Sequence, residues 1–366
     1  MDSGRESTFV HREVQALVLL TLVAVAAFFL TRSVAHANRE RRRADAREWA
    51  RRGAGALQAG QPAPASAALQ RATVLDPANV SYRIELARSL TAQGSDAAAR
   101  QILLDVLATD SRHIDVNLAL GRLEAPRGDV DRVVRYYQTA IDEMWMSGQA
   151  SRRYEVRSEL ARYLISRGQR SRALSEVLIL SAEAPDTAIA RAAVGRLFVD
   201  CGDAARALAE FDRALTLEPA NQTVRLAGAQ AAFSLGDDRR ALAYLRGTSS
   251  LDAARDLSAL ITTVLSSDPL APRLTAAERE RRLRLAIARA TDRASACASP
   301  PPSADALNAF AAALSATGTR RPTVSDVADD GVELVLKIER ETAACAPVTT
   351  TDRALMVVGS RHEGSS

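Results

Sequence analysis

Six glycines recur along this chain at nearly constant spacing, and this spacing limits the possible folds more than any other feature of the sequence. They are Gly60, Gly94, Gly128, Gly168, Gly202 and Gly236, separated by 34, 34, 40, 34 and 34 residues. Each stands where a helical pattern breaks, and most are followed by a polar or acidic residue, as is typical of a turn between two helices. A fixed period of this length predicts an array of helical hairpins.

The residues around each glycine fit the packing of one helix against another. A small or short apolar residue stands five positions after it, at Ala65, Ala99, Val133, Ala173, Ala207 and Ala241. A larger apolar residue stands nine positions after it in all six cases, at Leu69, Leu103, Tyr137, Val177, Phe211 and Leu245. Seven positions before it stand only glycine or alanine, at Gly53, Ala87, Gly121, Ala161, Gly195 and Ala229. We expect two helices to approach closely there, since a larger side chain would not fit a close-packed contact.

This pattern resembles the tetratricopeptide repeat family. The resemblance is clearest at Gly195, Phe198, Gly202, Ala207, Phe211, Ala214 and Pro219, and again at Trp49, Gly53, Gly60, Ala72 and Pro77. It implies an all-α fold with repeats at 46–79, 80–113, 114–147, 154–187, 188–221 and 222–255. The departures from the family pattern are Arg52 and Gly228 in place of large apolar residues, Glu124 and Pro126 in the first helix of the third repeat, and the sixth repeat after Leu245. Six extra residues, 148–153, follow Trp145 and Met146 and indicate either a longer loop with a packed tryptophan or an exposed apolar contact point.

The N-terminal region predicts a membrane anchor. No charge interrupts Val14 to Thr31, and as a helix this stretch would reach about 27 Å, close to the thickness of a hydrocarbon core. We assign 1–13 to a short tail, 14–34 to a transmembrane helix and 35–45 to a basic linker. A cleaved signal segment is the alternative, because Ala35-His36-Ala37 has the form of a cleavage site. Arginines are denser after the span, at Arg32, Arg39, Arg41, Arg42, Arg43 and Arg47, so the positive-inside rule favours a bacterial inner-membrane protein with a cytoplasmic soluble part.

Four arginines share one position in consecutive repeats. Arg88, Arg122, Arg162 and Arg196 each stand six residues before a turn glycine, at a position that faces the concave groove in the family this chain resembles. Planar guanidinium groups in a row suit carboxylates, so the implied partner is an acidic or extended protein segment. The alternative is that these arginines only pair with acidic neighbours on solvated helix faces.

The C-terminal region, 256–366, predicts further helices followed by a disordered tail. Helical segments are expected at 252–266, 276–298, 304–316 and 325–344, and Thr275 with Glu278 predicts a capping box at the start of the second. They form either a small helical domain or a cap on the last repeat. Cys297 and Cys345 each end a helix just before a proline, and two such ends on one side could form a disulfide, which would require an oxidising compartment.

Charge and motifs argue against other classes of function. The 48 cationic residues face 44 anionic ones, so the net charge of +4 does not indicate nucleic acid binding. None of the four histidines has a partner at metal or triad spacing, and no phosphate-binding loop is present. We therefore expect no catalytic residues, metal or cofactor, and a non-enzymatic membrane-anchored scaffold or adaptor for protein–protein interaction. The alternative is an exported structural or assembly subunit of a bacterial envelope or secretion complex, with Cys297 bonded to Cys345.

Overall fold

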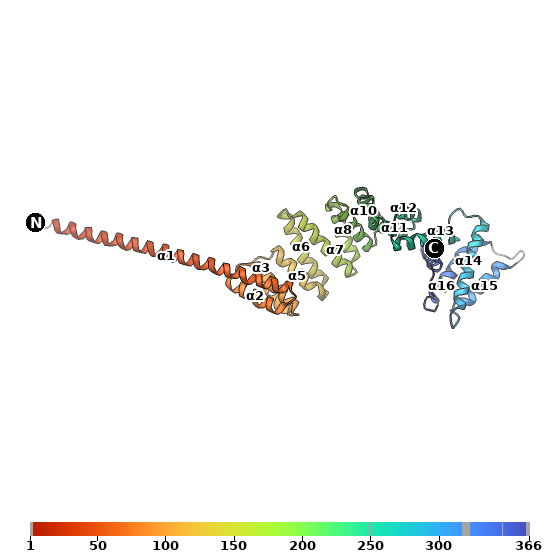
Figure 1. Cartoon of the computed structure of the whole chain (residues 1–366), viewed down its shortest axis with the longest axis horizontal. Helices are drawn as coiled ribbons and strands as arrows, with labels where there is room; N and C mark the ends of the chain where they lie inside the picture. Colours follow the sequence, from red (N-terminus) through yellow and green to blue (C-terminus); the bar gives the residue numbers. More distant parts are fainter. Residues whose placement is uncertain (1–2, 249, 317–322, 346, 364–366) are drawn as a thin grey trace. The chain divides into compact units, whose positions relative to one another are not determined.

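The structure is a computed structural model that describes residues 3–248, 250–316, 323–345 and 347–363. Within these residues all regular structure is helical (Figure 1). The helices before the sixth turn glycine are α1 (Ser3–Gln58), α2 (Pro62–Leu75), α3 (Val80–Ala92), α4 (Asp96–Leu107), α5 (Ile114–Glu124), η1 (Ala125–Arg127), α6 (Val130–Met146), α7 (Ala150–Ser166), α8 (Arg170–Glu183), α9 (Ala188–Asp200), α10 (Ala204–Leu217) and α11 (Gln222–Ser234). They are followed by α12 (Asp238–Leu245), α13 (Asp252–Ser267), α14 (Ala276–Ser295), α15 (Ala304–Ser315), α16 (Val324–Glu341) and α17 (Thr350–His362). The chain divides into two compact units, Met1–Tyr163 and Leu164–Ser366.

The predicted helical hairpins are present, and their turns have the expected chemistry. All six turn glycines have positive φ, between 68° and 89°, which is the left-handed conformation that ends a helix without strain at glycine. The acidic residues after three of these glycines cap the next helix: the side chains of Asp129, Asp203 and Asp237 each accept a hydrogen bond from the backbone N–H three residues later. A turn glycine followed by an aspartate therefore ends one helix and starts the next.

Close packing explains the glycines seven residues before the turns. A Cβ atom placed on Gly53 would lie 2.6 Å from Leu69 Cγ, and one on Gly195 would lie 2.6 Å from Phe211 Cε1. The large apolar residue nine positions after each turn thus fills the space that the small residue leaves. Gly228, which departs from the repeat pattern, is compensated in the same way by the Tyr244 ring, 2.7 Å from its Cβ position.

One helix runs through the segments predicted as tail, anchor and linker. Helix α1 runs without a break from Ser3 to Gln58, so the residues assigned to a basic linker, 35–45, are helical and join the apolar stretch to the first repeat. From Leu20 to Gln58 this helix is long and apolar enough to cross a membrane, with a mean hydropathy of 1.6 in its most apolar window and none of that window buried. Apolar side chains such as Leu20, Phe29 and Leu30 are exposed along it.

The insertion between the third and fourth repeats is mostly helical. Only 147–149 separate α6 from α7, and the remaining inserted residues extend the start of α7. Met144 is fully buried, whereas Trp145 and Met146 are 62% and 78% exposed, and the Arg153 guanidinium lies 4.2 Å from the centre of the Trp145 ring. The exposed contact point is therefore the interpretation that fits these side chains, rather than a packed tryptophan.

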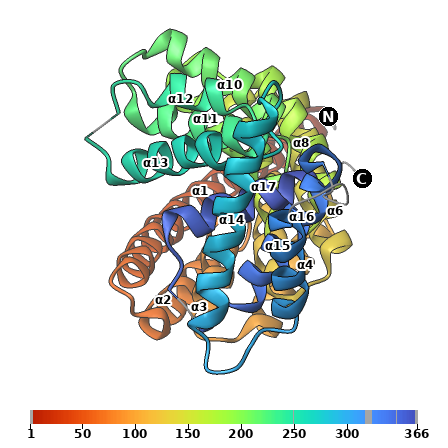
Figure 2. The ribbon, with the colours of Figure 1, turned by 90° about the vertical axis from the view of Figure 1, so that its right-hand side faces the viewer.

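The C-terminal helices share one apolar core with the sixth repeat. Leu283 and Ile287 of α14, Val335 of α16 and Val358 of α17 are buried together, and Phe233 of α11 packs against them. Figure 2 shows α14, α16 and α17 beside one another. Helix α17 was not expected from the sequence, which left a disordered tail here; residues 364–366 lie outside the described part of the chain. Only half of the predicted capping box forms at Thr275, because Glu278 Oε1 and Oε2 accept bonds from Arg281 and Arg282; the complete box is at Thr349 and Asp352.

Candidate functional site

A groove of about 590 Å³ lies between the first helices of the second and third repeats. Helix α3 supplies Ile84, Glu85 and Arg88, and helix α5 supplies Leu118 and Arg122. The rest of the lining is Ser81, Ala87, Thr91, Ala92, Leu103, Asp115, Ala119 and Leu123. Apolar residues and the two arginines line it together, and the arginines stand at matching positions of the two repeats, so the groove combines apolar side chains with two guanidinium groups.

Arg122 is held in place by an acidic residue of the following repeat. Its Nε and Nη2 donate hydrogen bonds of 2.8 and 2.7 Å to the two carboxylate oxygens of Glu159 on α7. The Tyr137 hydroxyl donates a third, of 2.7 Å, to Glu159 Oε1. These bonds, that from Arg122 above all, lower the pKa of Glu159, and burial raises the pKa of Tyr137. The carboxylate therefore stays charged and orients the arginine at the edge of the groove.

The structure brings two of the four predicted arginines into one site. Arg88 is exposed and pairs with Glu85, one turn away on the same helix, at 2.8 Å. Arg162 is exposed on α7, where its charge contributes to the low pKa of Glu159. Arg196 is exposed on α9, in the other compact unit. Pairing with acidic neighbours, the alternative interpretation, thus describes Arg88 and Arg122.

Three acidic residues at the groove were not predicted. Glu85 lines the groove and pairs with Arg88 within α3. Asp115 also lines the groove and accepts a hydrogen bond from Arg152 of α7, and Glu159 holds Arg122. These last two pairs join residues 37 positions apart, three fewer than the 40 that separate the two turn glycines. Pairs of acidic and basic residues at this constant offset are the sequence signal from which Asp115 and Glu159 could have been predicted.

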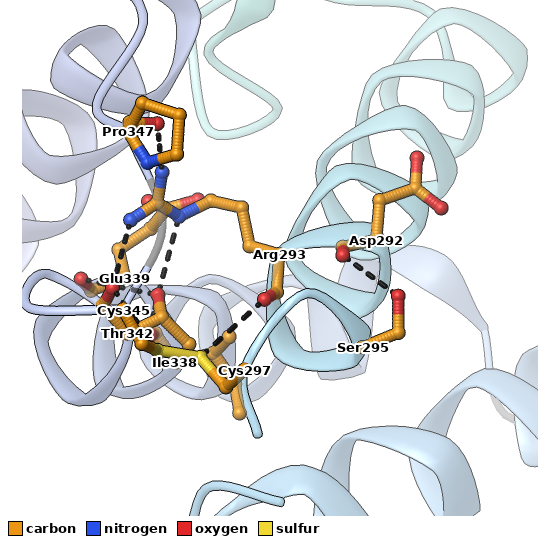
Figure 3. Close-up of a disulfide and its surroundings, with 9 residues drawn as sticks. All are labelled: Asp292, Arg293, Ser295, Cys297, Ile338, Glu339, Thr342, Cys345 and Pro347. Atoms are coloured by element: carbon orange, nitrogen blue, oxygen red, sulfur yellow. Dashed lines mark hydrogen bonds and ion pairs between the residues drawn. A yellow bond between two sulfur atoms is a disulfide. The ribbon is translucent and has the colours of Figure 1, made fainter. Parts of the chain in front are cut away.

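The second cluster of interest contains the disulfide between Cys297 and Cys345 (Figure 3). The two Cα atoms are 5.3 Å apart, within the usual range for a disulfide. It joins the segments that follow α14 and α16, and Cys345 is exposed whereas Cys297 is half-buried. Beneath it the buried Arg293 donates to the Thr342 hydroxyl at 3.2 Å and to the Pro347 carbonyl at 2.9 Å.

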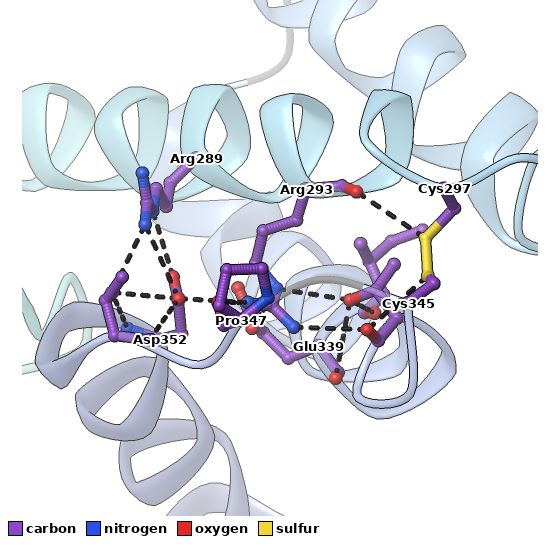
Figure 4. A network of polar contacts seen from close by, with 10 residues as sticks. Arg289, Arg293, Cys297, Glu339, Cys345, Pro347 and Asp352 are labelled. Carbon is purple, nitrogen blue, oxygen red and sulfur yellow. Dashed lines mark hydrogen bonds and ion pairs between the residues drawn. A yellow bond between two sulfur atoms is a disulfide. The ribbon is translucent and has the colours of Figure 1, made fainter.

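Arg293 also belongs to a network of four charged side chains (Figure 4). Its Nη1 donates to Asp352 Oδ2 at 3.0 Å, and Arg289 Nε donates to Asp352 Oδ1 at 2.9 Å. Burial would raise the pKa of Asp352, but the bonds from Arg289 and Thr349 outweigh it and lower this pKa to about 2. Glu339 Oε2 lies 2.9 Å from Arg293 Nε without the geometry of a hydrogen bond, and burial raises the pKa of Glu339 to about 7.

The fold and the repeat pattern together define the class of this protein. Pairs of helices recur every 34 residues, with one interval of 40, turn at left-handed glycines and pack a large apolar residue onto a small residue of the preceding helix. This is the tetratricopeptide-repeat fold, here with a long apolar N-terminal helix and a helical C-terminal region. Among the described residues, no group of three or more histidine, cysteine or acidic side chains could hold a metal ion.

Comparison with known proteins gives structural neighbours only. No family model matches the sequence, and no curated protein matches it. The C-terminal part of a repeat-containing protein from Cytophaga hutchinsonii covers 84% of this chain and 98% of its own, with 12% identity and a TM-score of 0.44. Pseudomonas aeruginosa PilF covers 60% and 98% with 17% identity and a TM-score of 0.43, and a tetratricopeptide repeat protein from Parabacteroides merdae covers 66% and 91% with 14% identity and a TM-score of 0.41. At these identities the likeness concerns the fold alone.

Proposed function

We propose that this protein is a membrane-anchored scaffold whose groove binds an acidic or extended segment of a protein partner. One observation supports the proposal above all: Arg88 and Arg122 of adjacent repeats line a single cavity together with the apolar residues Ile84, Leu118 and Leu123. An extended segment could place a carboxylate against the guanidinium groups and an apolar side chain against the apolar residues.

The two arginines contribute differently to such a site. Arg122 is fixed by Glu159, so it presents its remaining donors in a defined orientation at little entropic cost. Arg88 has only an exposed contact within its own helix, a kind of pair that is worth about 0.3–0.5 kcal/mol. A partner carboxylate can therefore displace Glu85 from Arg88 more easily than Glu159 from Arg122.

The membrane anchor in this proposal is the apolar part of α1. Exposed leucine, valine and phenylalanine side chains follow one another from Leu20 to Val34, and water would be an unfavourable surrounding for so continuous an apolar surface. Residues 14–34 would span about 31 Å as a helix, which matches a hydrocarbon core. Because α1 continues into the first repeat, the anchor and the repeats would share one helix.

Charge reversal tests the groove. We expect the Arg88→Glu variant of the full chain, in detergent-solubilised membranes, to recover several-fold less partner in a pulldown than the unchanged protein. Arg51→Glu is the matched control, since Arg51 also pairs with a glutamate three residues away on an exposed helix but does not line the groove. Equal recovery with both variants would contradict the proposed site.

The disulfide favours a second candidate, an exported structural or assembly subunit of an envelope or secretion complex. A disulfide persists in an oxidising compartment, whereas the arginines after the apolar stretch favour a cytoplasmic soluble part.

Thiol trapping separates the two candidates. In a Cys201→Ser variant the only cysteines are Cys297 and Cys345. Cells are lysed in denaturant with an alkylating maleimide, and the protein is then reduced and treated with a heavier maleimide. Two thiols that react only after reduction would support the exported subunit; two that are blocked at lysis would support the cytoplasmic adaptor.

A further inference from the structure

Helix α17 covers a position of the sixth repeat that lines the groove elsewhere in the array. Thr91, three residues before Gly94, lines the groove of the second repeat. Phe233 stands at the equivalent place, three residues before Gly236. The Arg361 guanidinium of α17 lies 4.8 Å from the centre of the Phe233 ring and donates to the Phe233 carbonyl at 3.0 Å.

The contact of α17 with the sixth repeat is specific and partly shielded from solvent. Arg361 donates two hydrogen bonds, of 2.9 and 2.8 Å, to the carboxylate of Asp238, the first residue of α12. Asp238 is buried, and a bidentate pair of this kind is stronger than an exposed ion pair. Leu355 and Val358 of α17 lie in the same apolar core as Val264 of α13. Helix α17 therefore packs its apolar side chains on α13 and contacts the sixth repeat through Arg361.

Two kinds of contact, ion pairs and a disulfide, connect the start of α17 to α14. Its first-turn residue Asp352 accepts hydrogen bonds from Arg289 and Arg293 of α14. The disulfide joins Cys297, just after α14, to Cys345, four residues before the N-cap Thr349. The chain that leads into α17 is thus held at one point by charge and at another by a covalent bond.

We propose that α17 is an internal occupant of the groove face of the sixth repeat, tethered there by the Cys297–Cys345 disulfide. Exchange with a dithiol reduces the bond: a thiolate attacks a sulfur, Cys345 being the more exposed, and the second thiol of the reductant resolves the mixed disulfide. Two electrons and two protons pass to the cysteines, and the dithiol becomes a disulfide. Without the tether α17 separates more often from Phe233 and Asp238. Binding of a partner segment to the uncovered face rests on the proposed function. The occupancy of this face by α17 and the tether by the disulfide do not depend on it.

The disulfide closes the loop 297–345, and α17 lies just outside this loop. The loop-closure entropy of the bond therefore concerns unfolding of α14–α16 and not the opening of α17 alone. The bond acts on α17 by fixing Cys345, four residues before the N-cap Thr349, so we expect reduction to change the opening equilibrium of α17 by only several-fold.

Amide hydrogen exchange on the full chain in detergent micelles tests the proposal, with and without dithiothreitol. We expect reduction to speed exchange in 350–362 and in 231–240, and to leave 80–124 in the other unit unchanged. Unchanged exchange in 350–362 would overturn the tether. Equal loss of protection throughout α14 and α16 would also overturn it, because the disulfide would then stabilise the whole core rather than α17.

A second measurement tests the occupancy while the disulfide is intact. We expect Arg361→Glu to speed exchange in 355–362 and 231–240. Arg353→Glu is the matched control, because Arg353 is exposed on the same helix and its side chain bonds only to Thr350, one turn away. Restored protection in a variant with both Arg361→Asp and Asp238→Arg would support the paired contact, and equal effects of Arg361→Glu and Arg353→Glu would overturn it.

Discussion

Two glycines on α1, two residues apart, allow a direct test of how the repeats pack. Gly53 is buried, and a Cβ atom there would lie 2.6 Å from Leu69 Cγ and 3.2 Å from the backbone oxygen of Ala65. Gly55 is exposed, and no atom lies within 4 Å of its Cβ position. Both are helical, so alanine improves helix propensity equally, by about 0.8–1 kcal/mol. Only at Gly53 is this gain opposed by overpacking, which costs about 1–3 kcal/mol.

We therefore expect Gly55→Ala to stabilise the first hairpin by about 1 kcal/mol and Gly53→Ala to destabilise it by about 1 kcal/mol. Leu69 is fully buried, so it cannot move aside without disturbing its other neighbours. The difference of about 2 kcal/mol corresponds to roughly a 30-fold change in the opening equilibrium, which hydrogen exchange of residues 49–75 in the full chain would measure. If Gly53→Ala protects these amides as well as Gly55→Ala does, then the explanation of the small residues before each turn is wrong.

Three further predictions concern the groove, the C-terminal core and a helix cap. Tyr137→Phe removes the hydrogen bond to Glu159, and we expect it to destabilise the third repeat by about 1 kcal/mol in urea unfolding, with Tyr136→Phe as the control. The pKa of Glu339 is about 7 in the folded chain, above its ordinary value of 4.5, so as pH rises the unfolded chain loses this proton before the folded chain does. The free energy of unfolding therefore falls by about 3 kcal/mol as pH rises from 4.5 to 7. Thermal unfolding at pH 5 and pH 7.5 should show this fall in the unchanged protein and not in Glu339→Gln; a fall of equal size in the variant would assign it to another group. Asp203→Ala removes the cap of α10 and should cost about 1 kcal/mol, whereas Asp203→Asn keeps an oxygen that can accept the same hydrogen bond; equal exchange of 204–208 in the two variants would argue against the cap.

The hairpins could be predicted from the sequence because their determinants are local. A turn glycine, the capping residue after it and the apolar residues at fixed distances lie within a few helical turns, so the chain specifies each hairpin without reference to distant segments. Even the distorted end of α5 follows from Pro126, which ends the helix at Glu124 and leaves a short 3₁₀ turn. The unbroken course of α1 could not be predicted in this way, because charge density alone made 35–45 look like a linker.

The four arginines six residues before the turn glycines show what repeat position can and cannot predict. Arg88 and Arg122, which share position six before the turn, line one cavity, but this position did not reveal which arginine a carboxylate would hold. Glu159 meets Arg122 because the six-residue insertion sets the offset between the third and fourth repeats. The second and third repeats are only 34 residues apart, so the equivalent residue after Arg88 is Ala119, which has no carboxylate, and Arg88 pairs within its own helix. Of the two arginines in the groove, Arg88 is therefore the one whose charge is more available to a partner.

The C-terminal helix could not be predicted because its stability depends on contacts far along the chain. Residues 350–362 contain a glycine and few strong helix formers, so their helical propensity alone is weak. Arg361 meets Asp238 across 123 residues, and Asp352 meets Arg289 across 63. A repeat array must end in a helix face that has no following repeat to cover it. Here α13 packs on α11 and α12, and α17 packs in turn on α13 and reaches Phe233 and Asp238 through Arg361, so α17 depends on contacts with helices that are distant in the sequence.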